Sequence, residues 1–495
     1  MGGIKKEATL IEAFIPILFL IALLTLNVIF FGDDTLAGSN QIALILAAGV
    51  AAVIANAHGA SWKSVRTSIV KSISTSMPAM IILLLIGSLA GTWLISGVVP
   101  ALIYYGLQII HPKIFLFTAV IVSGVVSMVT GSSWSTIATI GVALLGIGKA
   151  MGINEAMVAG AIISGAYFGD KMSPLSDTTN LAPAMAGTDL FTHIRYMTIT
   201  TIPAMLLTLI IFLVIGFTYD FTSVQTNIED VFAAIEENFV IVPWLFLVPV
   251  ILIAIIIAKV SPLPALLFGT LLGAIFAIIF QPHIIENIAG EGRNYAQSSY
   301  IAVMKAMYGE VTITSQNEII SRLFSTGGMA GMLNTIWLIM SAMIFGGVME
   351  AAGLLVKISK GIISLANSTG SIIASTIGTS IFFNITASDQ YIAIVVPGRM
   401  YTETFKARGL KPEVLSRTLE DGGTVTSVLV PWNTGGATQA KVLGVPTLSY
   451  LPFCFFNILS PIVSIIIAYL GYKIRYYKEG EQPHPDFTEE ERMDY

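Results

Sequence analysis

The chain has 495 residues, of which only 11% are charged and 55% are hydrophobic, and its formal net charge is −5. A soluble protein carries about 25% charged residues, and no water-soluble domain could bury this much apolar surface. The composition therefore excludes a soluble enzyme, a disordered chain, a secreted disulfide scaffold and a nucleic-acid-binding protein. Long unbroken apolar runs predict an all-α polytopic membrane protein, because the strands of a membrane barrel alternate apolar and polar residues.

Membrane spans are predicted wherever the apolar character lasts long enough, since a helix needs about 20 such residues to cross the hydrocarbon core. Nine segments qualify: residues 10–31, 41–57, 78–94, 114–129, 203–217, 240–258, 262–280, 333–348 and 447–470. Shorter, broken apolar pieces lie within residues 132–168 and 371–430. Together these segments predict roughly 11–13 crossings.

Charged residues between the spans predict the orientation, because Lys and Arg gather in cytoplasmic loops. They cluster near the two ends of the chain, at residues 5–6 and 473–478. Two further clusters lie at residues 63–71 and 399–411. Residues 218–238 carry five acidic and no basic side chains, which predicts an external loop. Both termini are then cytoplasmic, and each half crosses an odd number of times. This places a first repeat at 1–217, the connecting loop at 218–238, a second repeat at 239–472 and a cytoplasmic tail at 473–495.

The two halves share landmarks at a nearly constant separation, slightly more than half the length of the chain. The polar break at residues 131–133 corresponds to that at 386–388, Pro174 to Pro431, and Pro203 to Pro461. Similar halves with odd numbers of crossings are inverted relative to each other, as in many secondary transporters. The spacing therefore predicts two inverted repeats with broken helices or re-entrant hairpins.

Three polar breaks interrupt the apolar sequence, at residues 130–136, at 169–180, and in two parts at 384–390 and 420–436. Backbone groups freed inside a bilayer must be satisfied by protein, water or an ion. The breaks supply backbone carbonyls, hydroxyls, amides and carboxylates, which are the oxygen donors that a hard alkali cation needs. The breaks thus predict an ion-binding site.

Carboxylates in these breaks are the strongest functional candidates, because an acidic group costs roughly 2.5–3.5 kcal/mol at a helix centre in the membrane. Burial raises the pKa of a carboxyl group and a bound cation lowers it again, so one group can exchange a proton for a cation. Asp177 is the first candidate, and Asp170 and Asp389 are the second. Neutral oxygen ligands are expected from the same breaks: Ser132, Ser133, Ser176, Thr178, Thr386, Asn433 and Thr434.

Structural interpretations compete with these roles. Lys171 could pair with Asp170 in a surface loop, and Asp389 could simply cap the helix that follows it. Glu420 and Asp421 follow Arg417, which predicts that one of the two is a surface or paired charge.

The breaks resemble those of NhaC-type sodium/proton antiporters, above all in residues 165–180, Gly-Ala-Tyr-Phe-Gly-Asp-Lys-Met-Ser-Pro-Leu-Ser-Asp-Thr-Thr-Asn. Residues 131–134, 419–424 and 431–433 carry further parts of the resemblance, which extends over about residues 86–465. It implies two inverted repeats in the bacterial cytoplasmic membrane, commonly with a dimeric scaffold. It also implies that sodium binds near the midplane and is exchanged for protons. Among the residues of the breaks, the expected sodium ligands are Asp177, Ser132, Thr386 and Asn433.

Other chemistry is not expected. The chain has no phosphate-binding loop and no zinc motif. We therefore expect that it is not an enzyme and that it uses no cofactor. Partners are the ions and the lipid bilayer. Some relatives resemble malate/lactate exchangers, so a sodium-coupled carboxylate exchanger is the alternative. A dicarboxylate prefers a guanidinium partner, and no Arg lies within any break; Arg195 and Arg399 both lie outside the breaks.

Overall fold

The computed structural model describes residues 8–31, 38–218, 228–258, 260–313, 324–364 and 366–477. Most of the predicted tail and residues 219–227 of the predicted connecting loop lie outside this part of the chain. The first half forms α1 (Leu10–Phe31), α2 (Ser39–Ala57), α3 (Trp62–Ile95), α4 (Val98–Ile109), α5 (Pro112–Thr130), α6 (Ser133–Thr136), η2 (Ile137–Gly141), α7 (Val142–Ala150), α8 (Glu155–Met172), α9 (Asp177–Ala186) and α10 (Leu190–Thr218).

Helix α11 (Ile228–Asn238) forms inside the predicted connecting loop. The second half continues with η4 (Pro243–Phe246), α12 (Leu247–Ile257), α13 (Pro262–Phe280), α14 (Pro282–Ala289), α15 (Tyr295–Tyr308), β1 (Val311–Thr312), β2 (Ser325–Thr326), η5 (Ala330–Met332), α17 (Leu333–Ala351), α18 (Leu354–Ser364), α19 (Thr369–Thr386), α20 (Ile392–Ala407), α21 (Pro412–Leu419), η6 (Glu420–Thr424), η7 (Ser427–Leu429), α22 (Thr434–Leu443), α23 (Thr447–Tyr450), η8 (Leu451–Phe453) and α24 (Phe455–Tyr469). The two strands pair antiparallel.

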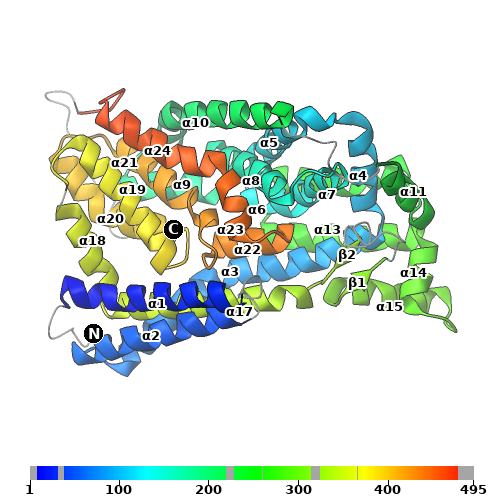
Figure 1. Cartoon of the computed structure of the whole chain (residues 1–495), viewed down its shortest axis with the longest axis horizontal. Helices are drawn as coiled ribbons and strands as arrows, with labels where there is room; N and C mark the ends of the chain where they lie inside the picture. Colours follow the sequence, from blue (N-terminus) through cyan, green and yellow to red (C-terminus); the bar gives the residue numbers. More distant parts are fainter. Residues whose placement is uncertain are drawn as a thin grey trace.

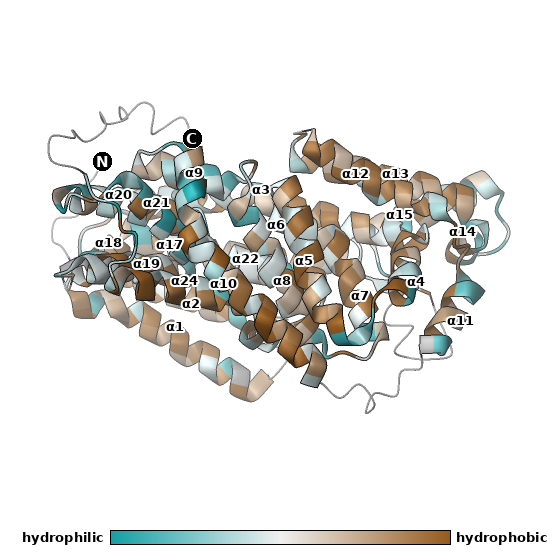
Figure 2. Cartoon of the chain, turned by 90° about the horizontal axis from the view of Figure 1, so that it is seen from above, coloured by the Kyte–Doolittle hydropathy of each residue, from teal (hydrophilic) through white to brown (hydrophobic). Residues whose placement is uncertain are grey.

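The helical membrane fold is confirmed. Among the described residues, eight helices are long and apolar enough to cross a membrane, or ten if each of two bent helix pairs counts as one span. All nine predicted spans fall on helices, and two of them, α1 and α13, have the predicted bounds. The remaining described helices, including α8, α9 and α19–α22, are too short or not apolar enough to count as spans. Apolar residues predominate on α1, α5, α10, α12 and α13 (Figure 2).

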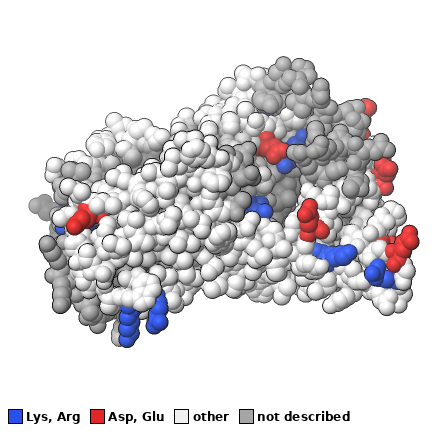
Figure 3. Space-filling model, turned by 60° about the horizontal axis from the view of Figure 1, so that its bottom comes forward, with Lys and Arg blue, Asp and Glu red and all other residues white. Residues whose placement is uncertain are grey.

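Helices α1, α2, α3 and α17 lie together along one side of the molecule, and α10 lies along the opposite side (Figure 1). Helices α6, α8 and α22 lie between these two sides (Figure 1). Most of the face shown in Figure 3 is free of charged side chains, which gather mainly toward its right-hand end and its edges. A lipid-facing surface requires such a distribution, because a charge in hydrocarbon is costly.

Helix α8 packs directly on the backbone of α5. At Gly165 and Gly169 a side chain would collide with the carbonyl oxygens of Val120 and Gly124. Small residues that repeat every four positions allow helices in membranes to approach this closely. The close packing fixes the end of α8, where Asp170 and Lys171 are found.

The repeat seen in the sequence extends to the helix boundaries. Helices α9 and α22 have ten residues each, with Ser176 and Asn433 as N-caps and Gly187 and Gly444 as C-caps. Helices α4 and α5 of the first half correspond to α18 and α19 of the second, because their first residues have nearly the separation found between the N-caps of α9 and α22. Each pair therefore has the same place in its half, and the inversion of the halves stays a prediction.

Candidate ion-binding site

A cavity of about 430 Å³ brings the three polar breaks together. Seven residues predicted for the ion site line it: Asp170, Asp177, Asp389, Ser132, Ser176, Thr178 and Thr434. Thr75, Ser76 and other residues of α3 close another side, and the first residues of α13 also contribute. None of the described residues lining the cavity is Lys, Arg or His. Three carboxylates thus share a space that no basic side chain borders.

Asp170 lies near the end of α8, at the buried part of the cavity, with 8% of its surface exposed. The hydroxyl of Ser133 donates a hydrogen bond of 2.6 Å to its Oδ2. Ser133 is the first residue of α6, and Ser132 is the N-cap of that helix. A hydroxyl donor stabilises the ionised carboxylate, so Asp170 can present a negative charge to the cavity.

Asp177 is exposed, in contrast to the desolvated position expected of it. It is the first residue of α9, and its predecessor Ser176 caps the helix by accepting a hydrogen bond from the Thr179 backbone amide at 3.4 Å. Asp177 therefore contributes a solvent-accessible carboxylate to the cavity, while Asp170 contributes a buried one.

Asp389 caps a helix and also lines the cavity. Its Oδ1 accepts hydrogen bonds from the backbone amides of Tyr391 at 2.9 Å and Ile392 at 3.1 Å, at the start of α20. The predicted capping interaction is therefore present. Its Oδ2 accepts a hydrogen bond from Ser76 at 3.3 Å, and the side chain lines the cavity with only 2% of its surface exposed.

Two expected sodium ligands, Thr386 and Asn433, are not among the cavity-lining residues. The Thr386 hydroxyl donates to the Phe382 carbonyl one turn earlier, at 2.7 Å. The Asn433 oxygen accepts from the Gly435 amide at 2.9 Å, and its amide group donates to the Asn384 carbonyl at 3.0 Å. The structure engages both side chains in local hydrogen bonds, so of the four expected ligands only Asp177 and Ser132 reach the cavity.

Lys171 follows Asp170 in the sequence and has a different partner from the one considered. Its ammonium group forms an ion pair with Oδ1 of Asp421 and donates a hydrogen bond of 3.1 Å to Ser460. Asp421 also accepts hydrogen bonds from Ser460 at 2.8 Å and Thr200 at 3.3 Å. The interpretation of Lys171 as the partner of Asp170 is therefore wrong.

Glu420 and Asp421 are both completely buried, so neither is a surface charge, while the expectation of a paired charge holds for Asp421. Both lie in η6, a π-helical turn, and such turns occur frequently at functional sites. A second π-helical turn, η2, directly follows α6 at the cavity. Each part of the site thus includes one irregular helical turn.

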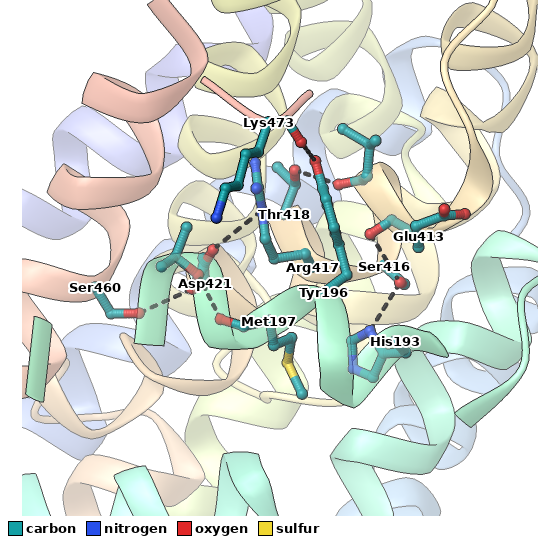
Figure 4. A network of polar contacts seen from close by, with 12 residues as sticks. His193, Tyr196, Met197, Glu413, Ser416, Arg417, Thr418, Asp421, Ser460 and Lys473 are labelled. Carbon is teal, nitrogen blue, oxygen red and sulfur yellow. Dashed lines mark hydrogen bonds and ion pairs between the residues drawn. The ribbon is translucent and has the colours of Figure 1, made fainter. Parts of the chain in front are cut away.

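Arg417, which the sequence offered only as a charge preceding Glu420 and Asp421, is a buried part of this site that was not predicted. It is completely buried, its Nε lies 3.9 Å from Oδ2 of Asp421, and its guanidinium stacks on the ring of Tyr196 at 4.7 Å (Figure 4). On α10, His193 contacts the hydroxyl of Ser416 at 2.8 Å (Figure 4). The four-residue spacing between Arg417 and Asp421, which places both on one helical face, was the available signal.

The family that this chain matches and three of its relatives are antiporters. Residues 165–472 match the profile of the Na+/H+ antiporter family. The Na+/H+ antiporter NhaC of Bacillus subtilis (strain 168) is 36% identical over 431 residues, which are 87% of this chain and 92% of that protein. The malate-2H+/Na+-lactate antiporter of the same organism is 37% identical over 442 residues, 89% of this chain and 91% of that protein. The arginine/ornithine antiporter ArcD of Halobacterium salinarum (strain ATCC 700922 / JCM 11081 / NRC-1) is 33% identical over 482 residues, 97% of this chain and 95% of that protein.

Proposed function

Because this chain belongs to the Na+/H+ antiporter family, we propose that it exchanges sodium ions for protons across the bacterial cytoplasmic membrane. Sodium leaves the cytoplasm and protons enter, driven by the proton gradient. Both termini are cytoplasmic in this proposal, as the distribution of Lys and Arg predicts.

The single observation that carries the proposal is the group of three carboxylates around one cavity, whose lining among the described residues includes no Lys, Arg or His. Like charges in a shared, partly buried site disfavour one another's ionisation. A positive charge relieves this repulsion, and either a sodium ion or protons can supply it. Sodium and protons therefore alternate as the balancing charge of the cavity.

The sodium ion binds between Asp170 and Asp177, with hydroxyl oxygens of Ser132, Ser176 and Thr178 as neutral ligands. These groups are oxygen donors, which hard cations prefer. Asp177 meets the ion first because it is exposed, and Asp170 holds it at the buried end. Uptake of a proton by these carboxylates, or by an acidic group coupled to them, expels sodium, and sodium binding expels that proton.

A second cavity supports transport by alternating access. It has a volume of about 440 Å³ and is lined by a later part of α3 (including Leu94), by α7, and by the end of α22 (including Lys441). The first cavity meets the same α3 at Thr75 and the same α22 at Thr434. Shared helices thus connect two spaces at successive levels of the molecule. In the proposed cycle the ion enters from one cavity and leaves through the other after reorientation.

A sodium-coupled carboxylate exchanger is the second candidate. The cavity volume lies within the range of small-molecule sites, about 300–1,000 Å³, and a relative carries malate and lactate in its name. A carboxylate substrate would have to enter beside three carboxylates of the protein without a basic side chain in the lining. The charge of the cavity therefore favours the cation.

Proteoliposomes test the proposal. We expect an outward sodium gradient to drive proton uptake without any organic acid, and Asp177→Asn to reduce this flux at least about tenfold, or ~1.4 kcal/mol. Asp189→Asn is the matched control, because Asp189 accepts a hydrogen bond from the Thr192 amide outside the cavity and Asn can keep that bond. Flux that requires added malate or lactate would replace this proposal with the second candidate.

A further inference from the structure

Four charged side chains behind the cavity are completely buried: Lys171, Arg417, Glu420 and Asp421. They number two cations and two carboxylates, but they are not paired one to one. Asp421 receives both cations, Lys171 through Oδ1 and Arg417 at 3.9 Å from Oδ2. Glu420 forms an ion pair with neither cation: Lys171 acts on it only electrostatically, and neither of its carboxyl oxygens has a hydrogen-bond partner within the described structure. The guanidinium group of Arg417 likewise has no hydrogen-bond partner there.

An ionised Glu420 is costly in this position. A buried charge costs several kcal/mol unless a partner and additional hydrogen bonds compensate for its loss of water. A protonated Glu420 avoids that cost, but it leaves Lys171 and Arg417 with only one negative charge between them. The buried cluster then carries one positive charge in excess, and a nearby carboxylate must balance it.

Asp170 is that carboxylate. It precedes Lys171 on α8 and interacts electrostatically with Glu420, while its side chain lines the cavity. Asp170 and the cluster together contain three carboxyl groups and two cations, so they need one further positive charge to be neutral. A sodium ion beside Asp170 supplies this charge from the cavity, and a proton on Glu420 supplies it from behind.

We propose that Glu420 is the residue that holds the exchanged proton, and that sodium at Asp170 displaces this proton without touching it. The inference rests on the proposed sodium/proton exchange and names the proton site for it. Sodium and proton then occupy separate groups, one in the cavity and one in the buried cluster. The two sites are coupled because Asp170 and the buried cluster together stay electrically neutral.

The other groups around η6 do not supply the missing charge. Helices α19 and α24 contain no Asp, Glu, Lys, Arg or His. The charged residues of α20 all reach solvent. On α21 the only charged residue besides Arg417 is Glu413, which pairs with Arg475 at 3.1 Å. On α9, Asp177 faces the cavity. On α10, Nε2 of His193 has no acceptor among the described residues, which disfavours a charged imidazole. Tyr196 stacks between the guanidinium groups of Arg417 and Arg475.

Infrared difference spectroscopy of the purified protein tests this directly, because a protonated carboxyl group has its own C=O stretching band. We expect sodium to abolish one such band in the wild type. Labelling the side-chain carboxyl carbon of all glutamates with ¹³C should shift this band, whereas labelling aspartates should leave it in place. A band that moves only with the aspartate label overturns the proposal, and this test requires no substitution.

A proton count provides the second readout. In weakly buffered solution, Glu420→Gln should release one proton fewer per bound sodium than the wild type, and Glu420→Asp should release the wild-type number. Unchanged proton release by Glu420→Gln, with sodium still bound, places the proton elsewhere and overturns the inference while sodium/proton exchange stands. Sodium binding by the wild type without any proton release would overturn the proposed function as well.

Discussion

The cavity and the buried cluster use similar residues in opposite ways. The cavity has three carboxylates and, within the described part of the chain, no basic lining residue, and it has room for a ligand. The cluster has two carboxylates and two cations, all completely buried. Asp170 and Lys171, neighbours on α8, each belong to one of these regions. The absence of an internal cation therefore marks the site that takes up sodium, whereas the cluster combines the ion pair of Lys171 and Asp421 with Glu420, the proposed proton site.

Removing the carboxylate of Asp170 should have the largest effect. Asp170→Asn eliminates the charge that faces both the cavity and the cluster, so we expect sodium binding to fall at least about 100-fold, or ~2.7 kcal/mol. Isothermal titration of the purified variant measures this. Asp189→Asn again serves as the control, and near-normal sodium binding by Asp170→Asn would eliminate the distinction between the two regions.

Breaking the cluster should instead affect folding. Lys171→Met leaves Asp421 buried beside a single, more distant cation, so we expect a loss of about 3–5 kcal/mol in the free energy of unfolding. Thermal unfolding in detergent measures it. The double variant Lys171→Met with Asp421→Asn should recover part of the loss, because both charges are then absent. An equally unstable double variant would show that packing, and not the ion pair, stabilises this region.

The hydroxyl that supports Asp170 should have an intermediate effect. Ser133→Ala removes a hydrogen bond to a charged group, which is worth about 1.5–3 kcal/mol. Because the bond favours the ionised form, its loss should weaken sodium binding about tenfold at a fixed pH. Ser123→Ala is a suitable control, since that buried hydroxyl on α5 has no partner among the described residues. Equal sodium affinities of the two variants would argue against a role for Ser133.

The smallest effect is expected at Asp389, where the two roles can be separated. Asn can keep the cap of α20, so Asp389→Asn should retain wild-type stability and lose no more than about threefold in sodium affinity. Asp389→Ala should lose about 1 kcal/mol of stability with the cap. Thermal unfolding and sodium titration of both variants check this. A loss at Asp389→Asn as large as that at Asp170→Asn would make the three cavity carboxylates equivalent.

Sequence reasoning located the cavity better than the cluster. The breaks were visible because polar residues interrupt apolar runs, and the structure brings Asp170 and Asp177 of the first half together with Asp389 of the second. The pairing of Lys171 with Asp421 was not predictable, because it depends on how two distant helices pack. Asn433 and Thr386 were assigned to the ion because their local hydrogen bonds cannot be predicted before the helix ends are known. These bonds compete with a role as ion ligands. The exposure of Asp177 was likewise not predictable, because it depends on how α9 packs: Thr434, at the same position of α22, is buried.

The dependence of sodium affinity on pH tests most directly whether sodium and protons supply the same balancing charge. If one proton must leave for each sodium ion that binds, lowering the pH should weaken the apparent affinity by about tenfold per unit through the range where that proton is bound. Sodium titrations of the purified protein at a series of pH values measure this slope. A sodium affinity that stays constant from acidic to alkaline pH would contradict the account.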